Sequence, residues 1–395
     1  MSPARTKAKP RSVRPTSISM HIVYFGQTPS QGTGSPITIL RHLQRFAAEG
    51  HRISVIGEWG APSTSAWPVL RLPHRRFWWP PFGANADWLR AWRMRLWAGE
   101  SARVLGERPT AVLTYLGYHS GLLSEVAAHY ARRFRLPLST IVHDDVAAFP
   151  SADPVAVKAT QQRYRWILEQ AHRNWFVSEE LAAAYGQSGG EDAVLLPIPE
   201  GTNRQTQWRT SFADRPVIVS AGFLYDEQIP LLTRLARIID RAGGHLLLLT
   251  RETPALRDLC TREPITLKAL LPSNSDALDF VATEAAGFLT AYCDRVEEMP
   301  WIRSSYPSKV VEFSHAGLPM LFVSPAASAI HRWNVTHAVP YNFTPDQEAG
   351  ISDFVGALQD PAGWEKAARS TRDLAEADFD PVRIHARLAG TLVGA

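Results

Sequence analysis

The chain has 395 residues, and its 45% hydrophobic content is enough to bury two full cores, so we expect two domains of similar size. The formal net charge of +4 is modest, and the absence of any run of about eighteen apolar residues excludes a transmembrane helix. The two cysteines, Cys260 and Cys293, have no spacing typical of a disulfide framework or a metal site. A reducing cytoplasm is therefore the expected location.

The first segment, residues 1–18, differs from the rest in composition. Five basic residues and no acid occur in its first fourteen positions, namely Arg5, Lys7, Lys9, Arg11 and Arg14. We predict a disordered basic tail. The segment lacks the apolar stretch of a secretory signal.

Short apolar runs then alternate with helical patterns, which is typical of parallel α/β units. In the first half the expected strands are 21–25, 53–56, 111–115, 139–143, 174–177 and 194–196. After a polar stretch the pattern restarts, with strands expected at 217–220, 245–249, 287–291 and 320–323. We predict an α/β protein of two Rossmann-like, doubly wound domains, 19–200 and 201–378, whose strand ends face a central cleft. An amphipathic helix is expected in the last segment, 379–395.

The stretch 305–319 reads S-Y-P-S-K-V-V-E-F-S-H-A-G-L-P and carries the strongest functional signal. Pro307 suits the first position of a helix, and Gly317 followed by Pro319 indicates its end, so we predict a helix from about 307 to about 316.

The first turn of this predicted helix concentrates hydrogen-bond donors. The amides and side chains of Ser308 and Lys309 would attract a phosphate group. Glu312 projects from the same face as Ser308 and could accept both hydroxyls of a ribose. The spacing therefore indicates a nucleoside diphosphate site. The alternative is an ordinary capped helix with a surface pair between Lys309 and Glu312.

The string P-S-K-x-x-E-(F/Y)-x-x-x-G-x-P resembles the nucleotide-sugar motif of the GT-B glycosyltransferases, particularly glycosyltransferase family 4 (glycosyl transferases group 1). The resemblance implies two domains facing a cleft and a terminal helix that crosses back to the first domain. It also implies a retaining, metal-independent transfer in which Glu312 acts at the ribose. No cofactor is implied, since the nucleoside diphosphate sugar is the donor substrate.

Two further sites gain a role from this resemblance. The loop after the first strand reads G-Q-T-P-S-Q-G-T-G-S-P, and Gly32, Thr33 and Gly34 match the loop that faces the donor diphosphate. His143 and Asp144 follow a predicted strand. From the residues alone they are a structural histidine and a helix cap, whereas the resemblance places them at the transferred sugar.

The sequence departs from the family pattern at three places. Ser304 stands where many members carry a first glutamate. Phe223 and Gln228 replace an arginine and a lysine that clamp the diphosphate, a loss of several kcal/mol of leaving-group stabilisation unless other cations substitute. Thr250 and Arg251 replace a glycine. The candidate substitutes are Arg251, Arg303 and Lys309.

The segment 67–97 is rich in tryptophan and arginine. It contains one acid, Asp87, six tryptophans and six arginines, namely Trp67, Trp78, Trp79, Trp88, Trp92 and Trp97 with Arg71, Arg75, Arg76, Arg90, Arg93 and Arg95. This mixture fits packing into the first domain, contact with an anionic membrane surface, or single-stranded nucleic acid. We expect peripheral contact with the inner face of the cell membrane and no nucleic-acid partner.

The leading hypothesis is a glycosyltransferase that moves a sugar to a glycan, lipid-linked or other acceptor in cell-surface polysaccharide or glycoconjugate biosynthesis. His143, Asp144 and Glu312 are its candidate catalytic residues. Gly32, Thr33, Gly34, Arg251, Arg303, Ser308, Lys309 and Glu312 are the candidate donor-binding residues. The alternatives are a non-catalytic GT-B protein that binds glycan or membrane as a scaffold, and a nucleotide-sugar epimerase.

Overall fold

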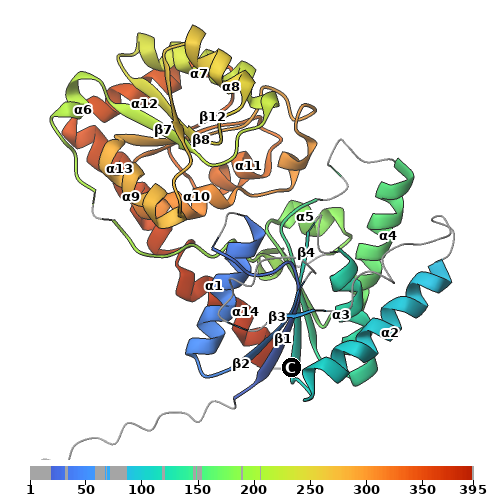
Figure 1. The fold of residues 1–395 in the computed structure, drawn as a ribbon. Coiled ribbons are helices and arrows are strands. Elements are labelled where there is room, and N and C mark those ends of the chain that lie inside the picture. Colours follow the sequence, from blue (N-terminus) through green and yellow to red (C-terminus); the bar gives the residue numbers. More distant parts are fainter. Residues whose placement is uncertain are drawn as a thin grey trace, which may run out of the picture.

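The computed structural model describes residues 19–31, 34–57, 67, 69–71, 87–117, 121–145, 148, 154–187, 190–204 and 206–393. The predicted tail, 1–18, lies outside this part of the chain. The described residues form two parallel six-stranded sheets, one in each half of the sequence (Figure 1).

The first sheet has the strand order β3-β2-β1-β4-β5-β6. Its central strands β1 and β4 are buried along their whole length, which explains why they read as continuous apolar runs. The strands are β1 His21–Gly26, β2 Arg52–Gly57, β3 Val69–Arg71, β4 Ala111–Leu116, β5 Leu138–Val142 and β6 Arg173–Phe176. The predicted strand 194–196 is wrong, because only an isolated bridge between Val194 and Phe176 forms there.

The second sheet has the order β12-β11-β10-β7-β8-β9, so its six strands follow the same topology as the first sheet. The strands are β7 Val217–Ala221, β8 His245–Thr250, β9 Ile265–Ala269, β10 Gly287–Ala291, β11 Met320–Val323 and β12 Asn342–Phe343. The sequence did not indicate the edge strands β3, β9 and β12. They are short or only partly buried, and therefore lack a long apolar run.

Helices cover both faces of each sheet, as expected of doubly wound domains. In the first domain, α1 and α14 lie on one side and α2, α3 and α4 on the other (Figure 1). The helices in the first half are α1 Ser35–Ala48, α2 Asp87–Leu105, α3 Gly121–Phe134, α4 Pro154–Gln170 and α5 Glu179–Ala184. Those in the second half are α6 Ser211–Asp214, α7 Ile229–Arg241, α8 Pro254–Arg262, α9 Asn274–Glu284, α10 Ser308–Phe313, α11 Ala329–Thr336, α12 Glu348–Gln359, α13 Pro361–Glu376 and α14 Pro381–Val393.

The C-terminal helix α14 crosses back to the first domain, as predicted. Its His385 contacts α1, where the Nδ1 atoms of His385 and His42 are 3.1 Å apart. The ring of His385 also packs edge-on against Phe46 of α1, at a centroid distance of 4.4 Å. The terminal helix therefore belongs to the core of the first domain, although the chain reaches it only after completing the second.

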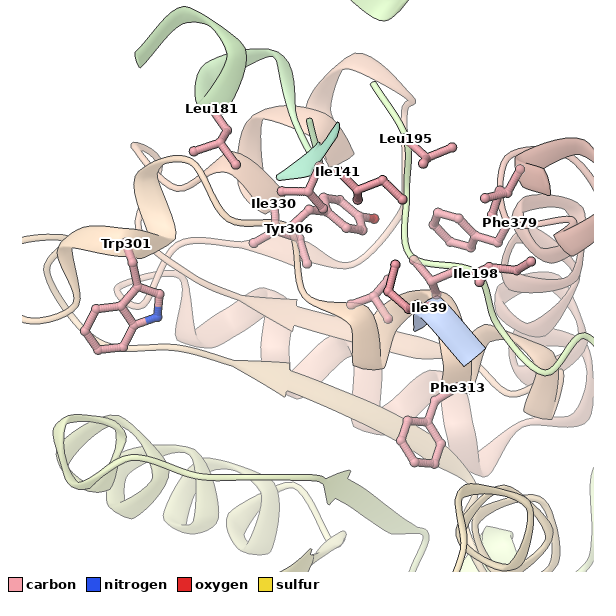
Figure 2. Packing of buried hydrophobic residues seen from close by; sticks show 14 of the residues in the cluster. Ile39, Ile141, Leu181, Leu195, Ile198, Trp301, Tyr306, Phe313, Ile330 and Phe379 are labelled. Carbon is pink, nitrogen blue, oxygen red and sulfur yellow. The ribbon is translucent and has the colours of Figure 1, made fainter. Parts of the chain in front are cut away.

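The buried side chains of both domains form one continuous cluster. Figure 2 shows its part around Tyr306, where side chains from the first half of the chain accompany side chains from the second. Those from the first half include Ile39, Ile141, Leu195 and Ile198, and those from the second include Trp301, Tyr306, Phe313 and Phe379.

Candidate functional site

A cavity of about 540 Å³ lies between the two domains, lined by the ends of strands from both sheets. In each sheet the strand order reverses beside the first strand, between β1 and β4 and between β7 and β10. Such switch points at the carboxyl ends of parallel strands are where α/β folds bind ligands. The cavity wall includes His143 after β5, Gly222 after β7, Arg251 after β8 and Tyr292 after β10.

The helix predicted from about 307 to about 316 is present, and its last turn is a 3-10 helix. α10 begins at Ser308, with Pro307 as its N-cap residue in an extended conformation, and a 3-10 turn, Ser314–Ala316, continues it. Gly317 ends the turn with φ 70°. A side chain there would also place its Cβ 2.8 Å from the carbonyl oxygen of Arg204, so both the conformation and the space require glycine.

Lys309 is one of the cations that line the cavity. Its side chain is partly buried, lines the cavity and has no hydrogen bond or ion pair to any residue that the structure describes. Burial lowers the pKa of Lys309 to about 8. Its Nζ lies beside the Gly222 backbone, 4.0 Å from where a Cβ on that glycine would stand. An unpaired ammonium in this position favours an anionic ligand.

Two hydroxyl groups of residues in the same cavity wall also lack partners within the described part of the chain. The Oγ of Ser305 and the phenol oxygen of Tyr306 are buried, and neither has a hydrogen bond within the described part of the chain. Both residues line the cavity. Because buried polar groups are normally paired, these atoms and Lys309 together indicate a polar ligand.

Glu312, for which the sequence suggested a ribose, is paired within the protein. Arg41 of α1 binds its carboxylate through both terminal nitrogens, at 2.6 and 2.8 Å, and also donates to the carbonyl oxygen of Ile198 at 2.9 Å. The side chains of Arg41 and Glu312 are only 12% and 10% exposed. This bidentate pair joins the two domains across the cavity wall.

His143 and Asp144 both line the cavity, immediately after β5. The Nε2 of the buried His143 lies 3.2 Å from the carbonyl oxygen of Leu195, so this nitrogen carries the proton and donates it. Burial lowers the pKa of His143 to about 4, and the ring is neutral near pH 7. Asp144 is partly buried and has no hydrogen bond or ion pair to a described residue. Desolvation raises the pKa of its carboxyl to about 6.

Phe223 and Gln228, which replace the two cations of the family pattern, lie in different environments. Phe223 lines the cavity and is 54% exposed. Gln228 turns inward, where its Nε2 donates to the carbonyl oxygen of Ala291 at 2.6 Å. The position of the missing first glutamate is structural, because Ser304 is buried and its carbonyl oxygen accepts the hydroxyl of Ser178 from the first domain.

The candidate substitute cations divide between the cavity and the surface. Arg251 is exposed, lines the cavity and has no ion pair to a described residue. Arg303 is absent from the cavity wall, and its guanidinium pairs with Glu297 at 2.8 Å instead. Of the glycine-rich loop, Gly34 is described and lines the cavity at the start of α1. Gly32 and Thr33 lie outside the described residues.

Sequence reasoning missed Arg41, Tyr225 and Trp301, all of which line the cavity. Arg41 is one of two arginines in an amphipathic helix, and nothing in that pattern separates it from Arg45. Its partner lies 271 residues away along the chain, so only the folded structure identifies it.

In the part of the chain that the structure describes, no group of His, Cys, Asp and Glu side chains could hold a metal ion. Within the same part, no helix is both long and apolar enough to cross a membrane.

The two similarly ordered parallel sheets, the central cleft and the returning terminal helix define a GT-B fold. Structures with this fold include HepE from Anabaena in complex with UDP and glucose, with 14% identity and a TM-score of 0.64 over 95% of this chain and 100% of that chain. A glycosyltransferase from Rickettsia africae has 9% identity and a TM-score of 0.63, over 95% of this chain and 98% of that chain. An α-glucosyltransferase in complex with UDP and a DNA containing an HMU base has 10% identity and a TM-score of 0.61, over 95% and 99%. No protein-family model and no curated protein matches the sequence. At identities this low the likeness establishes the fold alone.

Proposed function

We propose that the protein is a glycosyltransferase that moves a sugar from a nucleoside diphosphate sugar to an acceptor. The observation that carries this proposal is the unpaired Lys309 in the interdomain cavity of a GT-B fold, whose wall also includes Ser305 and Tyr306 with their unpartnered hydroxyls. The neighbouring structures support it, since HepE was solved with UDP and glucose and the α-glucosyltransferase with UDP.

In this proposal the diphosphate binds Lys309, Ser308 and Arg251. The ribose hydroxyls displace Arg41 and donate hydrogen bonds to the Glu312 carboxylate. Lys309 and Arg251 then replace the family clamp and stabilise the charge that develops on the leaving phosphate. The likeness of residues 305–319 to family 4 supports retention of anomeric configuration without a metal ion. Neutral His143 would hydrogen-bond a sugar hydroxyl, and the departing phosphate would take the acceptor proton.

A panel of UDP- and GDP-sugars, scored for release of the nucleotide, tests the proposed function. We expect turnover of at least one donor and its loss in Glu312→Ala. Failure of every nucleotide to bind at millimolar concentration would refute it. Interconversion of the donor sugar without an acceptor would identify an epimerase instead.

A non-catalytic scaffold is the second candidate. The Arg41–Glu312 pair favours it, because the Glu312 carboxylate that would bind the ribose already has a partner. The same panel separates the two candidates. A scaffold would bind no donor, or bind one without turnover whether or not glycan acceptors are added.

Asp144 gives the reaction a pH dependence. Because desolvation raises the pKa of this carboxyl to about 6, its ionised form is lost as the pH falls through that value. We expect kcat/KM to rise with an apparent pKa near 6. Asp144→Asn should remove this rise and lower the plateau about 100-fold, because a neutral amide replaces the charged acceptor of a sugar hydroxyl.

The control for this experiment is Asp145→Asn, since Asp145 is adjacent to Asp144 but is not part of the cavity wall. We expect its pH profile to match that of the unmodified enzyme. A rise near pH 6 that persists in Asp144→Asn would assign the titration to another group.

We also propose that α2 contacts an anionic membrane at the inner face of the cell membrane. This contact would give the enzyme access to a lipid-linked acceptor and thus a role in polysaccharide or glycoconjugate synthesis. Trp97 and Met94 pack into the core, whereas Trp92 and Leu96 on the same helix are 50% and 44% exposed. Exposed arginines lie nearby on α2 and on the adjacent α3, namely Arg95, Arg132 and Arg133. Exposed apolar side chains next to cations suit a surface of anionic lipid. Trp78 and Trp79 lie outside the described residues.

Trp92→Glu tests this contact. We expect binding to vesicles with 30% anionic lipid to fall at least tenfold, because the substitution replaces an inserting ring with a charge that the lipid repels. Val335→Glu is the matched control, since Val335 is 63% exposed on the other domain. Equal vesicle binding by both variants would refute the assignment, as would a preference for a DNA oligonucleotide over the vesicles.

A further inference from the structure

Three aromatic side chains line the cavity on the side of the second domain, close to where the family pattern has its two cations. Phe223 and Tyr225 are 54% and 37% exposed, while Trp301 is 7% exposed behind them. The rings of Phe223 and Tyr225 meet edge to face with centroids 4.8 Å apart, and those of Tyr225 and Trp301 lie 5.2 Å apart. We call these three residues the aromatic platform.

The aromatic platform is held in place by Gln228, the residue at the second missing cation. Its Oε1 accepts the backbone amide of Tyr225 at 2.8 Å, and its Nε2 donates to Ala291 at the end of β10. Gln228 is 1% exposed, so this link between the loop and the sheet is fully buried. A rigid loop presents its rings at low entropic cost to a ligand.

The cavity that the platform lines also contains two charged groups, Lys309 and Asp144. Gly222, next to Phe223, lies beside the Nζ of Lys309, which is the expected place of the diphosphate. Asp144 lines the same cavity as Tyr225, and its charge raises the pKa of Tyr225 in addition to the larger effect of burial. A group attached to a diphosphate at Lys309 would therefore lie in a cavity lined by both the aromatic rings and the Asp144 carboxylate.

We propose that the aromatic platform and Asp144 form the subsite for the donor sugar and select a neutral sugar over a uronic acid. This proposal rests on the proposed function and specifies its substrate class. A sugar ring has an apolar face of C–H groups that can cover an exposed aromatic ring, and its hydroxyls can donate to a carboxylate. The sugar carboxylate of a uronic acid would face the unpaired Asp144, and like charges in a partly buried site repel.

The test compares affinities for UDP, UDP-glucose and UDP-glucuronate by titration calorimetry, with GDP and GDP-mannose as the pair for a guanine site. We expect the sugar to strengthen nucleotide binding in the unmodified protein. In Phe223→Ala this gain should fall about fivefold, the size of a lost aromatic contact, while affinity for the bare nucleotide changes less than twofold. Phe223→Trp should retain the gain, and UDP-glucuronate should bind at least tenfold more weakly than UDP-glucose at pH 7.5.

The outcomes separate this inference from the function on which it rests. If bare UDP and GDP both fail to bind, the proposed function is overturned and the subsite with it. If a nucleotide binds but Phe223→Ala leaves the gain from the sugar unchanged, or weakens the bare nucleotide equally, the subsite alone is wrong. Equal affinities for UDP-glucose and UDP-glucuronate would overturn the selection for a neutral sugar.

Discussion

Replacing Lys309 with methionine is expected to lower kcat/KM for the donor by about 100- to 1,000-fold, the usual effect of removing one preorganised donor from a site of developing negative charge. The expectation is this large because the arginine and lysine of the family clamp are absent, and Arg303, one candidate substitute, pairs with Glu297 outside the cavity. Arg251 remains at the cavity wall but is exposed, where water weakens its effect.

The same substitution is expected to stabilise the fold. Burial lowers the pKa of Lys309 to about 8 from its ordinary value of 10.5, so the unfolded chain binds this proton more tightly than the folded protein does. The resulting penalty is fully present below pH 8 and disappears as the pH rises above 10.5. Because the side chain is only partly buried, we expect Lys309→Met to add about 2 kcal/mol to the free energy of unfolding at pH 7.

Steady-state kinetics and chemical denaturation at pH 7 measure the two effects on one preparation. Lys366→Met is the matched control, since Lys366 is exposed on α13 and should change neither quantity. A variant that is both inactive and less stable would show that Lys309 supports the fold, and it would contradict the proposed role.

Glu312→Ala and Arg41→Met should change nucleotide affinity in opposite directions. Glu312→Ala removes the charged acceptor of the ribose hydroxyls, and we expect UDP or GDP binding to weaken about 10- to 100-fold. Arg41→Met removes the competitor for that carboxylate, which it holds at 2.6 and 2.8 Å, so we expect binding to strengthen. The affinities should be measured by direct binding, because steady-state kinetics would also depend on any movement of the two domains that the Arg41–Glu312 pair joins.

Arg41→Met is expected to lower the free energy of unfolding by about 3 kcal/mol, since it leaves a largely buried carboxylate without its cation. Circular dichroism should confirm that the variant is folded before its affinity is measured. Arg45→Met, one helical turn further along α1, is the control because Arg45 does not line the cavity. If Arg41→Met weakened binding as Glu312→Ala does, the arginine would be a nucleotide ligand rather than a competitor.

The sequence predicted the two-domain α/β architecture because the central strands are buried on both faces and read as apolar runs. β1, β4, β7 and β10 were all expected within a residue or two of their observed ends. The edge strands β9 and β12 and the short β3 gave no such signal. The segment after Val194 gave a false one, since apolar residues such as Leu195 are buried there although only an isolated bridge forms.

The cavity was partly predictable for a similar reason. Lys309, Glu312, His143 and Asp144 each follow local signals, a capped helix or a strand end, and the structure places all four at the cavity wall. The resemblance of 305–319 to a known motif supplied the expected chemistry. Those signals act over a few residues, where chain geometry alone fixes which side chains share a face.

The tertiary structure decided the contacts between distant segments. Arg41 of the first domain binds Glu312 of the second, and Asp144 and Tyr225, also from different domains, line the same cavity. Neither pairing has a periodicity or spacing in the sequence, because each depends on how two separately folded sheets pack against one another. The sequence by itself thus determined the two-domain α/β fold and indicated Lys309 as a candidate cation, whereas the packing of the domains decided that Arg41 is the partner of Glu312.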